Sequence, residues 1–548
     1  MRVFVRVYER NFSRVRLLPL GLQLKAGSYS HAAIGGPLAA MFTATGPVQS
    51  LLALLSWTRS PVEFWTERGE LVWWGFINEV ESSLGMLRLG VSLRNMANAI
   101  AVTYEEVPPN QELGAGTSAT TAYAMDSESI ATFGTRELVA NLINAGSEVA
   151  IKQRDRLLSA LKAPLPIMAL DGDGAHEAKI QCIGWWGLLD GQRYSRESVC
   201  TGNATLGNNY GGGWSMDQPL YLQSFTLKSG EYSFRARGHS MQLSRPSGSN
   251  EAGNELDAWI YNDNGGAPGV AISGKGRIDA GLIATGDAWY PTYFEEPWPV
   301  LQPNTQYWFV AHYFRHWIAE ATKPRWMIHF APTDDWPYGQ AYVSNTDPDG
   351  GGATPPIANP TIHAPITIEG NPHSVFLWKI LGDQLTTDLI QQAINALDQG
   401  VITGVEVVNQ SGVYSNSYIS SDTNGLDAIL QYLDAGTTNG RRLLATVLPN
   451  RKVRVYEEPV SSETADYRVG LDGTIEDAHG TRIPRATFTP ARWLRLKLAG
   501  MSEKEIGLVG PISPVFIEEC EYDPATDRLA HLQPRDRLSM WDIGMVMK

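Results

Sequence analysis

The chain has 548 residues, of which 43% are hydrophobic and 19% charged, so it is not intrinsically disordered and should fold into about three or four domains. Its formal net charge of −14 argues against a protein that coats nucleic acid or an anionic membrane, although it suits the wall of a channel through which DNA passes. The three cysteines, Cys182, Cys200 and Cys520, are widely spaced, which excludes a disulfide-rich secreted scaffold and a zinc site.

The chain opens with a strand, because Val3, Val5 and Val7 alternate with larger or charged residues. No apolar segment of an export signal precedes this strand, and no run approaches ~18 apolar residues. The sequence therefore predicts neither a signal peptide nor a membrane span, and we expect synthesis in a cytoplasm.

A second strand is predicted near Ala39–Thr45, and a helix follows it with Pro47 in its first turn. A third strand, Pro61–Trp65, leads into a hairpin turn at Arg68 and Gly69. The apolar stripe of the helix is formed by Val48, Leu51, Leu52 and Leu55.

The most informative stretch of the chain runs from Trp73 to Tyr104. Two strand-like runs, Leu71–Ile77 and Met86–Leu93, flank an expected loop at Glu81–Gly85. A polar, Asn-rich step then leads into a further strand, Ala99–Tyr104.

This order of elements carries a family resemblance. A Trp-Gly strand, a short loop, a Ser-Leu strand, an Asn-rich bend and a strand ending in Tyr resemble the first domain of tailed-phage baseplate-hub and tail-tip proteins. The resemblance covers residues 1–105 and implies a tail-tube-like β-barrel with a helix over one opening. One tryptophan of the pair should pack in the barrel, and the glycine should permit a close approach of backbone. The residues that carry this motif are Trp73, Trp74, Gly75, Asn98 and Tyr104.

Residues 106–194 are interpreted as a connector, helices and the start of a second hub barrel. Helical periodicity is predicted from Ser129 to Leu142 and again over Val149–Lys162. Two strands, Lys179–Trp185 and Gly187–Tyr194, resemble the next strand pair of the hub family, whose motif residues here are Gly184 and Trp185.

The composition changes in residues 195–370, which are rich in Gly, Asn, Trp and Tyr. Short alternating runs recur about every 8–12 residues, which predicts an all-β sandwich. Three segments, Gln223–Leu227, Leu256–Gly269 and Leu301–Val310, resemble a jelly-roll module found in secreted and phage-attached proteins. That module is similar to carbohydrate-binding modules, and this resemblance implies an inserted, sugar-binding domain.

A sugar platform is predicted on the strand Leu256–Tyr261. Leu256, Ala258 and Ile260 should face the core, which would turn Asp257, Trp259 and Tyr261 outward. An outward Trp-Tyr pair can stack on sugar rings while polar neighbours bind the hydroxyls. Four other tryptophans could serve either binding or packing, namely Trp289, Trp298, Trp308 and Trp336.

After the predicted insertion the hub pattern resumes in residues 371–460. A helix spans Leu385–Leu397 with Gly400 as its stop, a strand follows at Val405–Val408, and a second helix starts near Asn424. A hairpin of Arg441–Leu448 and Arg451–Tyr456 completes this part. Residues 461–548 should form a small β-rich C-terminal region whose clearest turn is Leu471–Thr474.

No catalytic residue, cofactor motif or metal site is predicted. Walker, G-x-S-x-G, H-E-x-x-H and C-x-x-C patterns are missing from the sequence. The acidic pairs Glu295-Glu296 and Asp334-Asp335 lie among tryptophans, but neighbours on a strand point to opposite faces and so do not form a glycosidase pair. Asp171–Gly174 and Asp347–Gly350 lack the closing acid of a calcium loop, which favours ordinary Asx turns.

The family resemblance implies a structural virion protein of a phage tail tip, assembled in the host cytoplasm. Such proteins form a homotrimeric ring that joins the tail tube and distal tail proteins, surrounds the tape-measure protein and opens a path for DNA. Two barrels in each of three chains would match six tube subunits. The inserted domain would then contact host-surface glycans or neighbouring tail proteins.

Two other interpretations stay open from the sequence. The first is a tail-associated glycan hydrolase that uses Glu295 or Glu296, with the sandwich as its substrate-binding module. The second is a hub-like spike of a phage-derived contractile injection machine.

Overall fold

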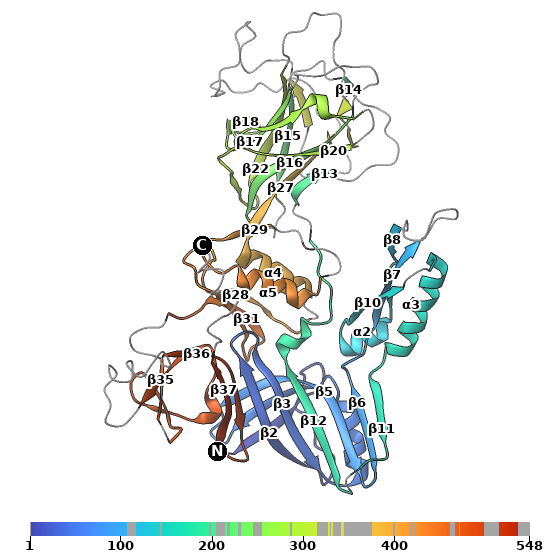
Figure 1. Cartoon of the computed structure of the whole chain (residues 1–548), viewed down its shortest axis with the longest axis vertical. Helices are drawn as coiled ribbons and strands as arrows, with labels where there is room; N and C mark the ends of the chain where they lie inside the picture. Colours follow the sequence, from blue (N-terminus) through green and yellow to red (C-terminus); the bar gives the residue numbers. More distant parts are fainter. Residues whose placement is uncertain are drawn as a thin grey trace, which may run out of the picture. The chain divides into compact units, whose positions relative to one another are not determined.

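Strands dominate the computed structural model of the chain, which confirms the predicted class, mainly β with some α (Figure 1). The chain forms two compact units: Met1–Ser195, Ile390–Ser411 and Ser420–Lys548 make the first, and Arg196–Leu389 and Gly412–Ile419 the second. The structure describes residues 2–106, 117–142, 145–172, 174–196, 199–203, 214–215, 220–227, 232–244, 255–284, 288–314, 327–328, 330–331, 341–344, 375–376, 378–397, 400–416, 419, 423–460, 466–470, 472–497 and 514–534.

The centre of the first unit is a curled sheet. Its neighbouring strands are, in order, β1 (Val3–Val7), β4 (Pro61–Thr66), β5 (Leu71–Leu84), β12 (His176–Gly184), β3 (Gly36–Thr45) and β2 (Gln23–Ala32). The sheet curls far enough to bring β1 beside β2, so it encloses a core that includes Phe42, Phe64 and Trp73. Apolar residues at alternate positions of these strands supply that core.

Helix α1 (Val48–Ala53) packs on this core and continues as a 3₁₀ helix, Leu54–Trp57. Leu51 and Leu54 are fully buried, whereas Val48 and Leu52 are 39% and 37% exposed. The predicted apolar stripe is therefore wrong at Val48 and Leu52. The helix has only six residues before it tightens, and the tighter winding places Leu54 on the buried side instead.

Two expectations about the strands of this sheet are corrected. The predicted loop at Glu81–Gly85 begins too early, because β5 runs to Leu84 and pairs there with both β6 (Leu87–Ser92) and β12. Hydrogen bonds on both strand edges hold these polar residues in extended conformation. The predicted strand Gly187–Tyr194 begins instead as a 3₁₀ helix, Trp185–Leu188.

Strand β7 (Ala99–Glu106) leaves the curled sheet for a smaller one. It pairs in parallel with β10 (Glu137–Leu142) and antiparallel with β8 (Thr117–Thr120) and β9 (Ala124–Met125), and α3 (Ser147–Leu161) packs on it. The helix predicted from Ser129 to Leu142 is wrong beyond Phe133. Helix α2 (Ser127–Phe133) ends at Gly134, whose φ is +80°, and the next residues pair with β7.

The remaining elements of the first unit, and helix α4 (Thr386–Leu397), which crosses from the second unit into the first, follow the predicted elements closely. Helices α4 and α5 (Gly425–Asp434), with Asn424 as the N-cap of α5, are confirmed. A three-stranded sheet contains β28 (Gly404–Val407), β31 (Lys452–Glu457) and β30 (Leu443–Val447). The C-terminal strands continue the curled sheet from β2 through β36; they are β32 (Tyr467–Gly470), β33 (Ile475–Asp477), β34 (Arg482–Ile483), β35 (Arg492–Lys497), β36 (Val515–Asp523) and β37 (Arg528–Pro534).

The second unit contains two main sheets around one hydrophobic core, in which Phe309 and Trp378 stack at 4.8 Å. One sheet contains β13 (Val199–Asn203), β14 (Trp214–Ser215), β16 (Phe234–Ser244), β20 (Ala288–Tyr293), β21 (Val300–Leu301), β23 (Met327–Ile328), β27 (Trp378–Leu385) and β29 (Tyr414–Asn416). The other contains β15 (Leu220–Thr226), β17 (Glu255–Asp263), β18 (Pro268–Ala271), β19 (Gly276–Asp279), β22 (Gln306–Phe314) and β25 (Ala341–Ser344).

Candidate functional site

The residues of the Trp-Gly strand make packing and chain contacts. Trp73 is fully buried in the core, which confirms that one tryptophan of the pair packs inside. Trp74 is half-buried, and its indole N–H donates to the carbonyl of Val447 at 3.1 Å. A Cβ on Gly75 would lie 2.2 Å from the carbonyl oxygen of Ile183, so the predicted close approach of backbone is also confirmed.

The other predicted motif residues lie at separate places in the first unit. Asn98 is fully buried beside α2, and Tyr104 is half-buried on β7. A Cβ on Gly184 would lie 1.7 Å from the carbonyl oxygen of Pro37. The Trp185 ring stacks on that of Phe76, with 5.5 Å between the ring centres. These residues hold elements together, and the structure does not bring them into one chemical site.

The predicted exposure of Asp257, Trp259 and Tyr261 is wrong, although the predicted division of the strand into two faces is right. The three residues do lie on the face of β17 opposite the core, but they are only 2%, 7% and 1% exposed. The Asp257 carboxylate accepts a hydrogen bond from the Arg277 guanidinium at 3.0 Å, and Tyr261 lies opposite Trp308 in the register. Alternation separates the two faces of a strand, but large side chains on neighbouring strands can cover the second face too. No exposed ring is offered for stacking here.

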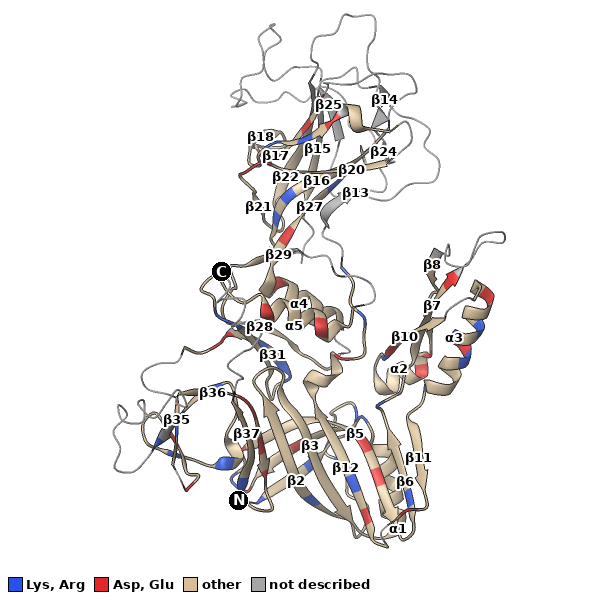
Figure 2. Cartoon of the chain, in the orientation of Figure 1, with Lys and Arg blue, Asp and Glu red and all other residues tan. Residues whose placement is uncertain are grey.

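The acidic candidates lie in different settings, and only some of them belong to the described residues. Glu295 and Glu296 are exposed neighbours in the chain. Among the residues that the structure describes, no three metal-ligating side chains lie together. Asp171 pairs with Arg88 of β6 at 2.8 Å. Charged residues also follow β5 and β12 of the curled sheet (Figure 2). Asp173, Asp334-Asp335, Trp336 and Asp347–Gly350 lie outside the described residues.

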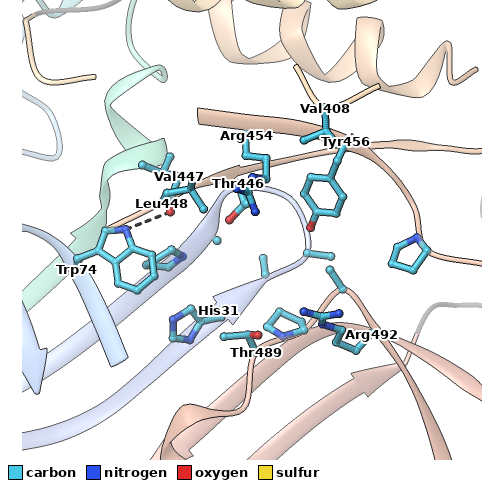
Figure 3. Close-up of a pocket in the computed structure, with 17 residues that line it drawn as sticks. His31, Trp74, Val408, Thr446, Val447, Leu448, Arg454, Tyr456, Thr489 and Arg492 are labelled. Atoms are coloured by element: carbon cyan, nitrogen blue, oxygen red, sulfur yellow. Dashed lines mark hydrogen bonds between the residues drawn. The ribbon is translucent and has the colours of Figure 1, made fainter. Parts of the chain in front are cut away.

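A cleft of about 430 Å³ opens in the first unit where several parts of the chain meet (Figure 3). Its walls come from the turn between β2 and β3, from β5, from the β30–β31 hairpin and from the residues just before β35. Gly35 ties the first wall to the hairpin, because its N–H donates to the Ala445 carbonyl at 2.7 Å. Ala33 ties it to β36 by donating to the Glu518 carbonyl at 2.6 Å.

Aromatic and apolar groups form most of the cleft wall. The indole of Trp74 is fixed by its bond to Val447, and the ring of His31 lies 6.1 Å from it. His31 is 3% exposed, and burial lowers its pKa to about 4, so the imidazole is neutral at physiological pH. The remaining apolar lining comes from Pro37, Val408, Leu448, Pro459 and Pro490.

Polar groups lie at the open side of the cleft. Figure 3 shows the Tyr456 hydroxyl pointing into it between Arg454 and Arg492. Burial raises the pKa of Tyr456, while both guanidinium groups lower it, so both charges act on this hydroxyl. No acidic side chain is among the described lining residues. The apolar walls can hold an apolar group of a ligand, and Tyr456, Arg454 and Arg492 can donate hydrogen bonds to an acceptor next to that group.

Sequence reasoning singled out only Trp74 among the residues of this cleft. The other lining residues come from segments far apart in the chain, and no spacing connects them. The alternation of β2 does place His31 on the same face as the core residue Tyr29, which was the one signal available.

The second unit carries an exposed aromatic row on β20. Trp289, Pro291 and Tyr293 occupy alternate positions, and the intervening Tyr290 packs toward the core. Tyr293 is 77% exposed, and the amine of Lys379 lies 4.9 Å from the centre of the half-buried Trp289 ring. Trp289 and Tyr293 are separated by about 13 Å along the strand, at a rise of ~3.3 Å per residue. Solvent-accessible rings of the second unit therefore lie on β20 and not on β17.

Comparison with known proteins does not identify a relative: no protein-family model and no curated protein matches the chain. In the described part of the chain, no helix is both long and apolar enough to cross a membrane.

Proposed function

We propose that this chain is a structural subunit of a phage tail tip, a hub protein that assembles with two further copies into a ring on the tail tube. The curled sheet of the first unit, with α1 packed on its core, is compatible with the tail-tube-like barrel that the resemblance implies. The separate second unit is compatible with an inserted sandwich domain.

The observation that carries the proposal is an apolar ridge on the first unit, made of Leu17, Leu18, Leu20, Val48 and Leu52. Leu17 and Leu20 are 91% and 92% exposed, the highest values among large apolar residues in the described ranges. Val48 and Leu52 extend the ridge along α1 with 39% and 37% exposure.

The segment that carries these leucines runs antiparallel to α1. Arg16 lies over the Trp57 ring at 5.9 Å, and further along the segment the Ser50 hydroxyl donates to the Leu20 carbonyl at 2.9 Å. Gly21 lies against Pro47 at the start of the helix. The leucines and the exposed residues of α1 therefore share one surface.

Covering this ridge would supply free energy for assembly. Burying a fully exposed leucine contributes about 1.5–3 kcal/mol, and two leucines of the ridge are almost fully exposed. A second copy of the chain is the occupant to which we commit, because a homotrimeric ring needs such a contact on every subunit.

The mass of the full chain in solution, measured by light scattering after size exclusion, tests the proposal. We expect a trimer for the wild type and a monomer for Leu17→Ser/Leu20→Ser, with the same secondary structure by circular dichroism because both side chains are exposed in the single chain. Val270→Ser, 64% exposed on the second unit, is the matched control and should stay trimeric. A wild type that is monomeric at high concentration and absent from virions by mass spectrometry contradicts the proposal.

For the second unit we propose contact with a host-surface glycan through Trp289 and Tyr293. Aromatic rings spaced along a strand can stack on alternate sugars of a polysaccharide. Affinity electrophoresis in gels containing host polysaccharides should show retardation that Tyr293→Ala removes. The control Val270→Ser should migrate like the wild type, and equal retardation of all three proteins contradicts this assignment.

The hydrolase and the injection-machine spike remain alternative proposals. Lysis zones in zymograms of host cell wall that disappear with Glu295→Gln or Glu296→Gln would favour the hydrolase. A long tape-measure gene upstream of this gene would favour the tail tip over the spike.

A further inference from the structure

Arginines and aromatic rings of the first unit are interleaved next to β5. The guanidinium of Arg59 lies 4.7 Å from the centre of the Phe76 ring and 5.7 Å from that of Trp185. The Arg10 guanidinium lies over Phe133 at 5.1 Å. Phe133 contacts Arg10 through its ring and Arg59 through its carbonyl, and Arg136 lies in the segment that follows it. We name Arg10, Arg59 and Arg136 the arginine cluster; the charges of Arg10 and Arg136 both act on Arg59.

The cluster contains more positive charge than the chain around it neutralises. Arg59 is only 7% exposed, and its Nε donates to the carbonyl of Phe133 at 3.1 Å. Arg10 donates to the carbonyls of Thr58 and Ser56. No member of the cluster forms an ion pair with a carboxylate of the described residues. Opposite charge reaches the cluster from Glu9, which acts on Arg10, and from Asp190, which acts on Arg136.

Burial and mutual repulsion both act against the charge of the cluster. Burial, together with the charges of Arg136 and Arg10, lowers the pKa of Arg59 to about 9. Burial also lowers the pKa of Arg136 and of Arg10. Carbonyl oxygens and ring faces compensate a buried guanidinium only in part, so an uncompensated cation destabilises the fold until an anion reaches it.

The donors of Arg59 are not all used within the protein. Its Nε is bonded, but its two terminal nitrogens have no acceptor in the part of the chain that the structure describes. Its planar fork can donate two parallel hydrogen bonds to an oxyanion. Arg10 and Arg136 are half-buried, so they are accessible from outside while Arg59 lies deeper.

We propose that the arginine cluster binds a phosphate group. Three guanidinium groups match the charge of about −1.5 to −2 and the several acceptor oxygens of a phosphate better than the single charge of a carboxylate. The phosphate can be free in solution or belong to a nucleic-acid backbone, since the chemistry of recognition is the same. The site does not depend on the assembly proposed above, because all its residues belong to one chain.

The test uses the full chain and inorganic phosphate as the probe, with malonate and chloride at matched ionic strength as comparison anions. Phosphate at about 50 mM should raise the melting temperature by about 2–4 °C, and the other two anions should not. Line broadening of the phosphate signal in ³¹P NMR gives an independent readout of binding. A 20-nucleotide single strand of DNA is the second probe. If the DNA displaces inorganic phosphate, the site binds the phosphates of a nucleic-acid backbone; if it does not, the site binds free phosphate.

Variants of the cluster separate binding from folding. Arg10→Gln and Arg136→Gln should each weaken phosphate binding at least about tenfold. Arg59→Met should remove the phosphate response, yet without phosphate it should melt no lower than the wild type, because it removes an uncompensated charge. The matched control is Arg14→Gln, whose side chain is 78% exposed and pairs with Glu9, and it should respond like the wild type.

The proposal is overturned if phosphate at this concentration produces neither a thermal shift nor line broadening. It is also overturned if malonate stabilises the chain equally, since the site would then recognise carboxylates. An unchanged phosphate affinity in Arg10→Gln and Arg136→Gln would place any bound phosphate elsewhere.

Discussion

Replacing Asn98 by alanine should destabilise the first unit by about 3–5 kcal/mol. Asn98 is fully buried, and its amide donates to the Ser129 hydroxyl at 3.1 Å and to the Gly134 carbonyl at 2.8 Å. Its side-chain oxygen accepts from the Arg136 N–H at 2.7 Å. Each lost bond contributes about 1 kcal/mol, and backbone groups left without partners add about 1–2 kcal/mol.

The measurement is equilibrium unfolding in urea, with hydrogen exchange of the β7 and β10 amides to locate the loss. Asn95→Ala is the matched control, because Asn95 lies exposed in the same bend and should change stability by less than about 0.5 kcal/mol. Faster exchange should be confined to α2, β7 and β10 if the loss is local. If the two variants differ by less than about 1 kcal/mol, the hydrogen bonds of Asn98 do not hold this region together.

Three further predictions concern stability. Gly75→Ala should cost about 1–3 kcal/mol or more in urea unfolding. Gly146→Ala has nothing within 4 Å and a φ of −73°, so it should cost no more than about 1 kcal/mol, the usual effect of alanine at a helix N-cap. Arg442→Met removes the guanidinium that donates to both carboxylate oxygens of Glu518 at 2.7 and 2.8 Å, and it should cost about 2–3 kcal/mol by the same measurement. Burial lowers the pKa of His31 from 6.5 to about 4, so the unfolded state takes up a proton first. Stability should therefore be full above pH 6.5 and fall by up to about 3 kcal/mol toward pH 4, and His31→Gln should show a shallower fall in pH-dependent unfolding curves.

Elements with a strong local signal could be predicted from the sequence. The alternation of Val3, Val5 and Val7 predicts β1, and the apolar periodicity before Gly400 predicts α4. Asn424 is the N-cap of α5, and its side chain accepts from the Leu426 N–H as such residues do. In each case residues near one another in the chain decide the conformation.

Elements decided by distant partners could not be predicted. The segment Glu137–Leu142 fits helix and strand periodicity equally, and its parallel pairing with Ala99–Tyr104 selects the strand. Strand β12 lies between β3 and β5, although the strands from β6 to β11 (Leu165–Ala169) separate it from β5 in the chain. The order of strands in a curled sheet depends on such pairings, which hydrophobic patterns do not encode.

The cleft around Trp74 and the arginine cluster could not be predicted for the same reason, because their residues come from distant segments of the chain. Trp74 could be predicted to matter, but its partner Val447 lies 373 residues away, so changing Trp74 would disturb both the cleft and the docking of β30. The arginine cluster also comes from distant segments, yet its members differ from packing residues in one measurable way. Truncating a residue that holds the fold together, such as Asn98, lowers the stability of the protein in any buffer. Truncating a residue that binds an anion, as we propose for Arg59, should remove only the stabilisation that the bound anion adds to the protein. Comparing melting temperatures with and without phosphate therefore separates the two kinds of buried polar residue in this protein.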